Sequence, residues 1–281
     1  MVRSGRERSR WCLAAGVGLA LAGCSGGAKS PTSQSPVLRV VAVADGYQCP
    51  RTIPSGMIHV AFENRDTTTH EIMFIRLAPG MSAADYMSFE RSGTDFPEGA
   101  VDCSGIGLTG PGERVEAWLR LEPGEYFLAC WFRNHLEHAR VQTLTVMADS
   151  TQGVEPPPVD ATVRLSDFRF DLRDSISRGV RVLRAETLGP SKHEMDLYRL
   201  DEGKSLADLR AWIHAKKHGL APAKSMGGVL DSHELPRVVW LRRDFPIGRY
   251  VMWCDMPMVD NVDIPNGKHS DAGMVREFEV R

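Results

Sequence analysis

The sequence has little net charge and no long hydrophobic run. Its 34 Lys and Arg residues nearly balance 36 Asp and Glu, so the formal net charge is -2. That balance provides no general field that would attract nucleic acid or an anionic membrane surface, and we expect no nucleic-acid partner. The most apolar stretch, residues 11–22, is too short to cross a bilayer as a helix.

Several motifs that mark common enzyme classes are also absent. The chain contains no G-x-S-x-G, no phosphate-binding Walker loop and no H-E-x-x-H. The sequence therefore assigns no catalytic residues, and whether the protein is an enzyme stays open at this point.

The first residues read as a targeting element. After the apolar run comes "LAGC", which ends at Cys24. Four arginines precede the run: Arg3, Arg6, Arg8 and Arg10. "LAGC" resembles the cleavage box of bacterial lipoproteins, which implies removal of residues 1–23 as a signal peptide and lipidation of Cys24. Residues 24–36 are rich in Ser, Gly and Pro and predict a flexible tether. We expect a lipid-anchored protein on the extracytoplasmic or periplasmic side of a bacterial cell envelope.

Cysteines are few, six in all, and their context predicts different roles. Outside the cytosol free thiols tend to be oxidised unless they are paired, buried or metal-bound. Cys49 and Cys103 both lie in loop-like contexts, and we expect them to form a disulfide, which in the chain-entropy model would add about 4 kcal/mol of stability. Cys130 and Cys254 instead end two apolar, alternating segments, "GEYFLAC" and "GRYVMWC".

Those two segments belong to an internal repeat. "HEIMFIRLAPGMSAAD" from His70 matches "HEMDLYRLDEGKSLAD" from His193, and the correspondence continues to the final segments "VQTLTV" and "VREFEV". Between the copies, residues 148–160 contain three consecutive prolines, typical of an extended linker. We therefore predict two domains, repeat 1 at 37–147 and repeat 2 at 161–281.

Alternation of apolar and polar residues indicates that both repeats are built mainly of short strands. One helix interrupts each copy, opened by the capping-box-like "SAAD" or "SLAD". The predicted fold class is all-β, with two tandem β-sandwiches that each carry a short helical insertion. In repeat 1 the strands are expected at 37–43, 57–63, 70–77, 115–121, 125–131 and 141–147.

Repeat 2 places four candidate metal ligands around its last strands. Tyr250, Met252 and Cys254 share one face of their strand, so the thiol can point between the sheets. His269 and Met274 lie in the segment before the last strand, and His193 precedes another strand. Two imidazoles, a thiolate and a weakly bound thioether are the ligand set that suits copper in electron transfer.

The most specific pattern is "H-x-x-x-G-M-V" from His269, preceded by "Y-x-x-x-C" ending at Cys254. With these residues the chain resembles the cupredoxin (blue copper) family, plastocyanin- or azurin-like, over both repeats. The resemblance implies Greek-key sandwiches, a type 1 copper held by His193, Cys254, His269 and Met274, and outer-sphere electron transfer. Glu194 stands where cupredoxins often place an asparagine that ties the ligand loops together.

Repeat 1 keeps only part of this ligand set. His70 and Cys130 correspond to His193 and Cys254, and alignment of the last strands puts His135 opposite His269 and Arg140 opposite Met274. His138 is an alternative to His135. Because the positive charge of Arg140 would repel a metal ion bound nearby, we expect one copper in repeat 2 and none in repeat 1.

The remaining histidines fit surface roles better than metal binding. His214 and His218 are spaced as a helical zinc pair, but no third ligand lies nearby in sequence, so we expect a solvated helix face. His59 and His233 are expected to be exposed. The chain has no H-x-H pairs, of which multicopper oxidases use several, and no identifiable second catalytic copper site of the nitrite reductase kind.

We therefore predict an exported copper-binding lipoprotein that passes single electrons between redox partner proteins. Two alternatives remain open. The sandwiches could be a metal-free binding or scaffold module of the envelope. Alternatively, Met256, Met258 and Met274 could hold Cu(I) for storage or delivery.

Overall fold

In this computed structural model the described residues are 37–92, 97–132, 135, 142–149, 153–258 and 267–281. Repeat 1 contains β1 (Val37–Val43), β2 (Gly46–Gln48), β3 (Thr52–Pro54), β4 (Gly56–Asn64), β5 (His70–Arg76), α1 (Ala83–Ser92), β6 (Val101–Thr109), β7 (Arg114–Leu121), β8 (Gly124–Ala129) and β9 (Gln142–Met147). Repeat 2 contains β10 (Ala161–Ser166), β11 (Arg169–Leu172), β12 (Gly179–Thr187), β13 (Met195–Leu200), α3 (Leu206–His214), β14 (Ala223–Val229), β15 (Arg237–Phe245), β16 (Gly248–Trp253) and β17 (Val275–Val280).

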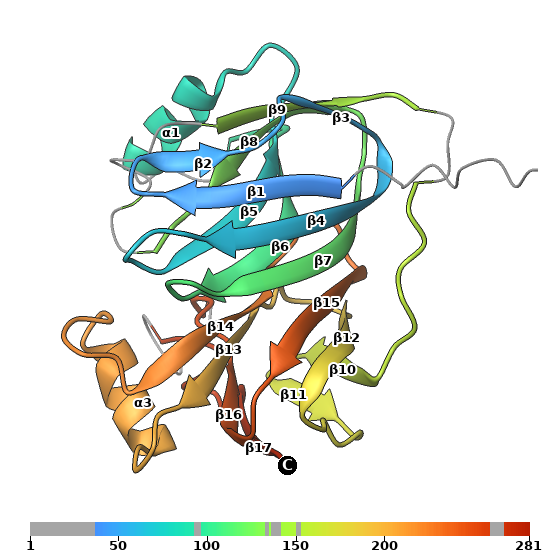
Figure 1. Cartoon of the computed structure of the whole chain (residues 1–281). Coiled ribbons are helices and arrows are strands. Elements are labelled where there is room, and N and C mark those ends of the chain that lie inside the picture. The colour runs from blue at the N-terminus through green and yellow to red at the C-terminus, as the bar shows by residue number, and fades with distance from the viewer. Residues whose placement is uncertain (1–36, 93–96, 133–134, 136–141, 150–152, 259–266) are drawn as a thin grey trace, which may run out of the picture. The chain divides into compact units, whose positions relative to one another are not determined.

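The two repeats share both of their sheets (Figure 1). One sheet has the strand order β11-β10-β12-β15-β7-β4-β1-β2, and the other has the order β17-β16-β13-β14-β6-β5-β8-β9-β3. The repeats meet where β7 pairs with β15 and β6 pairs with β14, both antiparallel. The predicted all-β class is confirmed, and the edge pairing joins the two sandwiches into one compact unit.

Strand pairing repeats from one half to the other, as the duplicated sequence predicts. β1 runs parallel to β4, and β10 runs parallel to β12. β5 lies between β6 and β8, while β13 lies between β14 and β16. Each half is thus a cupredoxin-like sandwich in which the strand that ends in a cysteine pairs with the strand that follows a histidine.

Alternation correctly predicts strands that face the core on one side. In β4, Ile58, Val60 and Phe62 are buried, whereas their neighbours are partly exposed. Burial of such side chains contributes about 25 cal/mol per Å² of apolar surface removed from water. The resulting core fills the space between the sheets in both repeats.

Both predicted helices are present, and both begin with the expected cap. The side chain of Ser205 accepts a hydrogen bond from the backbone of Asp208, whose carboxylate accepts one from the backbone of Ser205. Ser82 and Asp85 make the same reciprocal pair before α1. These caps satisfy N–H groups that would otherwise lack partners in the first turn.

β6 was not predicted from the sequence, where residues around Cys103 were interpreted as a loop. This strand is buried along almost its whole length, so its side chains show no alternation that would mark it as a strand. Gly105 in this strand follows from close packing against β5, because a Cβ there would lie 1.8 Å from the carbonyl oxygen of Ile72.

The predicted disulfide between Cys49 and Cys103 is wrong, since both are free cysteines. Cys49 follows β2 of one sheet, whereas Cys103 lies in β6 in the interior of the other. The Cys103 thiol lies 3.5 Å from the carbonyl oxygen of Val101 instead. The error came from placing Cys103 in a loop.

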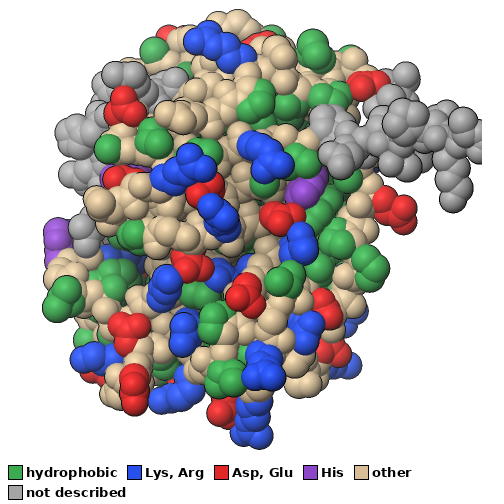
Figure 2. All heavy atoms as spheres, in the orientation of Figure 1, with side chains coloured by type: hydrophobic (Ala, Val, Ile, Leu, Met, Phe, Trp, Pro, Cys, Tyr) green, Lys and Arg blue, Asp and Glu red, His purple; other side chains and the backbone are tan. Residues whose placement is uncertain are grey.

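The predicted signal peptide, Cys24 and the tether fall outside the described residues. Among the residues that are described, none of the helices has the length and apolarity needed to span a membrane. On the face shown in Figure 2, basic and acidic side chains are interspersed, especially over its lower half, in keeping with the small net charge.

Candidate metal centre

Three of the four predicted ligands of repeat 2 lie close together in the structure. One donor atom each from His193, Cys254 and His269 lie within 4.8 Å of one another. The two Nδ1 atoms are 3.0 Å apart, and the Cys254 Sγ is 3.5 Å from the His269 Nδ1. All three side chains are buried, so the donors face one another in a site shielded from water.

Backbone hydrogen bonds of the segment around Cys254 and Met274 explain how distant residues meet. The Cys254 N–H donates to the carbonyl of Met274 at 3.2 Å, and the Ser270 N–H donates to the carbonyl of Cys254 at 3.1 Å. The Met274 N–H in turn donates to the carbonyl of His269 at 3.0 Å, across a turn that contains Gly273 at φ +101°. Met274 is thereby tied to both ligands, and its side chain is fully buried.

Asp167 contacts a candidate ligand, and the sequence did not predict this contact. Its Oδ1 lies 2.7 Å from the Nε2 of His193. A carboxylate on one ring nitrogen holds the tautomer that turns the other nitrogen toward the metal, an arrangement common for metal-bound histidines. Asp167 sits in the turn between β10 and β11, where an aspartate carries only an ordinary turn signal.

The protonation states of the site suit metal capture. Burial, and then the nearby His193, lower the pKa of His269 to about 4. Burial also lowers the pKa of His193, against an opposing effect of Asp167. Burial, followed by the charge of Glu194, raises the pKa of the Cys254 thiol well above its ordinary value. At neutral pH the site thus offers two neutral imidazoles and one thiol proton that an ion would displace.

The donor spacing fits a bound first-row metal ion. An ion about 2.0 Å from nitrogen and about 2.3 Å from sulfur, at near-tetrahedral angles, holds its donors about 3.3 Å apart for N–N and about 3.5 Å apart for N–S. The structure has 3.0 Å and 3.5 Å for these pairs. These two spacings therefore differ by no more than a few tenths of an ångström from those around a bound ion, and the donors of His193 and Cys254 lie within 4.8 Å of each other.

A glutamate follows the first histidine of each set, Glu194 after His193 and Glu71 after His70. Glu194 accepts a hydrogen bond from the N–H of Asp255, the residue after Cys254. Glu71 accepts one from the N–H of Trp131, the residue after Cys130. Each carboxyl group thus links the segment that carries one candidate histidine to the segment that carries the cysteine. Such hydrogen bonds around a metal site hold its ligands in position.

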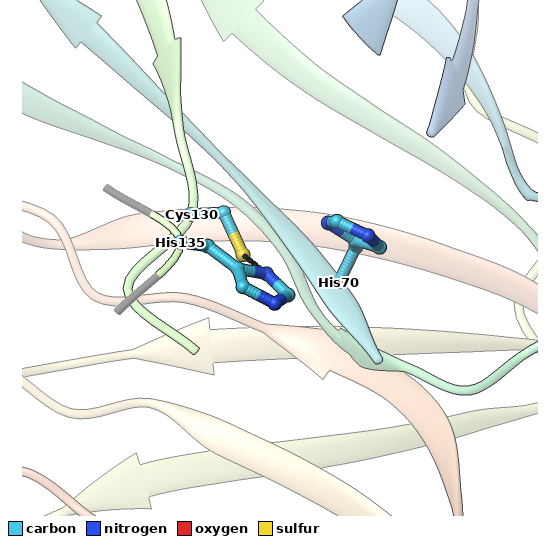
Figure 3. A group of neighbouring side chains, drawn as sticks. All are labelled: His70, Cys130 and His135. Atoms are coloured by element: carbon cyan, nitrogen blue, oxygen red, sulfur yellow. Dashed lines mark hydrogen bonds between the residues drawn. The ribbon is translucent and has the colours of Figure 1, made fainter. Parts of the chain in front are cut away.

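Repeat 1 also brings its three candidate ligands together. Donor atoms of His70, Cys130 and His135 lie within 4.8 Å of one another, and the Cys130 Sγ is 3.4 Å from the His135 Nδ1. Figure 3 shows the sulfur directed at the His135 ring, with His70 approaching from the start of β5. The Nε2 of His70 lies 2.8 Å from a carboxylate oxygen of Asp66, the counterpart of the Asp167 contact. Arg140 and His138 lie outside the described residues.

The other histidines have the surroundings of surface or structural residues. His214 and His218 are exposed on and after α3, as predicted, and His233 is exposed as well. His59 was expected to be exposed but is half-buried, because it stacks on Trp118 at a ring separation of 4.1 Å and bonds to Glu116. Within the described ranges, the metal-competent groups of His, Cys, Asp and Glu are the two His–Cys–His sets.

No protein-family model matches the chain, and no curated protein matches it. Among solved structures, an auracyanin from the photosynthetic bacterium Roseiflexus castenholzii matches with 20% identity over 39% of this chain and 95% of its own, at a TM-score of 0.30. Auracyanin A of Chloroflexus aurantiacus, a blue copper protein, matches with 14% identity over 40% of this chain and 98% of its own, at 0.29.

A copper-containing nitrite reductase from Thermus scotoductus matches with 12% identity over 87% of this chain and 61% of its own, at 0.24. At these TM-scores the likenesses support no conclusion about this chain, whose candidate metal site is inferred from its own side chains. The chain is a tandem β-sandwich protein of cupredoxin-like fold, with a buried His–Cys–His donor set in repeat 2 and a similar set in repeat 1.

Proposed function

We propose that the protein is an exported, lipid-anchored copper protein that transfers single electrons through a type 1 copper in repeat 2. His193, Cys254 and His269 are the equatorial ligands in this proposal, and Met274 is the weak axial ligand. The observation that carries it is the convergence of two Nδ1 atoms and one thiol in a buried site, at spacings that an ion can bridge.

When bound, copper would change between Cu(II) and Cu(I) by gaining or losing one electron. The chain's own task is to hold its donors in nearly the same places in both states, since small rearrangement favours fast electron transfer. Asp167 fixes the ring of His193, and Glu194 fixes the backbone beside Cys254. The backbone bonds that join Cys254, Ser270 and Met274 limit movement of the loop.

Burial of the site excludes water and competing ligands. His193 and Cys254 have no exposed surface, and His269 is 5% exposed. The ring of Phe168 packs edge-on against both histidines, with centroids 6.1 Å and 4.8 Å away. Such an enclosure supports outer-sphere electron transfer rather than binding of a substrate to the metal.

Titration of the purified protein with Cu(II) tests this function. We expect an intense visible thiolate-to-copper band that a chemical reductant removes and an oxidant restores. His269→Ala should abolish the band of repeat 2, while His214→Ala, which changes an exposed histidine, should leave it unchanged. A protein that shows no such band, or tight Cu(I) binding without reversible oxidation, would exclude electron transfer, and the second result would favour storage or delivery.

The membrane anchor has its own test. Full-length protein expressed in a bacterium should incorporate a labelled fatty acid and fractionate with membranes, and Cys24→Ser should lose both properties. Membrane association of the Cys24→Ser protein at the level of the unmodified chain would exclude the lipid anchor.

A further inference from the structure

Lys217 places a largely buried positive charge at the junction of the two repeats. Its side chain is 16% exposed, and its Nζ lies 3.4 Å from the Oδ2 of Asp255, the residue after Cys254. The same Nζ lies 6.0 Å from the centre of the Phe132 ring in repeat 1. At that distance an ammonium group is attracted to the face of an aromatic ring. A single side chain of repeat 2 thus contacts the segments that follow Cys130 and Cys254.

The backbone that carries Lys217 has an unusual conformation. The N–H of Lys217 donates to the carbonyl of Trp212 at 3.0 Å, which closes a Schellman-type turn after α3. Lys216 and Lys217 have φ angles of +55° and +58°, in the left-handed region that favours glycine. Such a conformation persists where the surrounding structure holds it. The contacts of the Lys217 ammonium group with Asp255 and Phe132 help to hold it here.

The Lys217 side chain stays charged in these surroundings. Burial lowers its pKa, but the charges of Asp196 and then Asp255 outweigh burial, so the pKa lies above its ordinary value. Asp196 is buried in β13, where its Oδ1 lies 3.3 Å from the backbone nitrogen of Leu108 in β6. Lys217 is therefore a fixed cation at neutral pH.

This cation lies close to the candidate copper site of repeat 2. Asp255 directly follows Cys254, and neighbouring Cα atoms are about 3.8 Å apart. Together with the 3.4 Å contact between Lys217 and Asp255, this spacing puts the Nζ within about 12 Å of the Cys254 Sγ. Charges at such a separation interact appreciably in a buried site, because little water screens them.

We propose that the ammonium group of Lys217 raises the reduction potential of the copper centre in repeat 2, and that the carboxylate of Asp255 lowers it. The inference rests on the electron-transfer function proposed above. Reduction of Cu(II) to Cu(I) adds one electron and lowers the positive charge of the site by one. A fixed cation nearby therefore favours Cu(I), whereas a fixed anion favours Cu(II).

The test uses full-length Cys130→Ser, which lacks one of the three donors of repeat 1, so that copper is confined to repeat 2. In this chain Lys217→Met should shift the Cu(I)/Cu(II) equilibrium about tenfold toward Cu(II), which is about 59 mV for one electron. Asp255→Asn should shift it in the opposite direction. Loss of packing alone would move both variants the same way, so opposite signs in a redox titration with mediators separate charge from structure. Shifts of the same sign, or none in Lys217→Met, would overturn the proposal.

Two further lysine variants serve as controls. Lys217→Arg keeps the charge and should keep most of the potential, while Lys204→Met, at an exposed lysine of the same repeat, should leave it unchanged. Should Lys217→Met fail to fold in thermal unfolding without metal, Asp255→Asn decides alone, because an unchanged or lowered potential there overturns the proposal. A Cys130→Ser chain without a copper band would overturn the electron-transfer function as well. A normal band with unshifted potentials would overturn only the role of Lys217.

Discussion

Glu194 accepts a hydrogen bond from the backbone N–H of Asp255, with 2.9 Å between Oε1 and N. The bond connects the residue after His193 with the residue after Cys254, both candidate ligands, and Glu71 makes the same bond with the N–H of Trp131 at 2.8 Å. Burial and nearby acidic groups raise the pKa of Glu194 well above its ordinary value. A buried carboxyl group is therefore an unusual acceptor for a bond between these two segments. Because the bond joins the segments that carry His193 and Cys254, we expect it to keep these candidate ligands in place.

Removal of the hydrogen bond between Glu194 and Asp255 should lower both the folding stability and the copper affinity of repeat 2. Glu194→Ala leaves the Asp255 N–H without its acceptor, which should cost about 1–3 kcal/mol of folding stability. The same change should weaken copper affinity about 10- to 100-fold. Glu194→Gln keeps an acceptor oxygen and should retain most of both. Denaturant unfolding and competition with a copper chelator measure the two effects.

Glu202→Ala, which changes an exposed glutamate of the same repeat, is the control and should change neither quantity. Equal effects of the alanine and glutamine variants would show that the hydrogen bond is not what matters.

The stability of the metal-free protein should depend on pH through Glu71. Burial, and then Asp196, raise the pKa of Glu71 from 4.5 to about 7. A raised carboxyl pKa means that the folded state holds a proton that the unfolded state has lost, so stability is fullest below pH 4.5 and falls as the pH rises through 7. Lys217 opposes this effect and Asp231 adds to it.

Glu71→Gln removes the titrating group and keeps the acceptor for Trp131. Relative to the unmodified protein, the variant should therefore gain stability between pH 4.5 and pH 8, by up to about 3 kcal/mol. Thermal unfolding across this range measures the difference, and Glu98→Gln, at an exposed glutamate, should show none. A difference that stays constant with pH would contradict the role of Glu71.

Asp167 should control metal affinity without contacting the ion. Asp167→Ala frees the Nε2 of His193, so the ring loses the partner that fixes its tautomer, and affinity in repeat 2 should fall about 10- to 100-fold. Asp171→Ala changes an aspartate of the same hairpin that pairs with Arg173 on the surface, and it should have no effect. Chelator competition in the Cys130→Ser chain gives both affinities, and similar values for the two variants would exclude the positioning role.

Metal binding in repeat 2 should release one proton at pH 7. The lowered pKa values of His193 and His269 leave both rings neutral, while the raised pKa of Cys254 keeps its thiol protonated before binding. Calorimetry in buffers of different ionisation enthalpy counts the protons, with Zn²⁺ as a redox-silent ion that takes the same ligands. In the Cys130→Ser chain we expect one proton per ion, and a count of zero or two would contradict these protonation states.

Sequence patterns predicted which candidate ligands lie together better than they predicted the residues around them. His193, Cys254 and His269 could be found because they flank strands that the repeat and the alternation mark. Asp167 and Tyr47 reach histidines more than twenty residues away in sequence from the β10–β11 turn and from β2, so no local pattern links them. Pairing of β6 with β14 and β7 with β15 likewise depends on tertiary contacts. The same limit led to the mistaken disulfide, because β6 has no alternation.

X-ray absorption at the copper edge, on the copper-loaded Cys130→Ser protein, tests the central claim most directly. We expect two imidazole nitrogens and one short sulfur bond around each ion, and we expect the sulfur bond to be lost when Cys254→Ser is added to Cys130→Ser. Copper surrounded only by nitrogen and oxygen, or a short sulfur bond that survives in the Cys130→Ser, Cys254→Ser double variant, would contradict it.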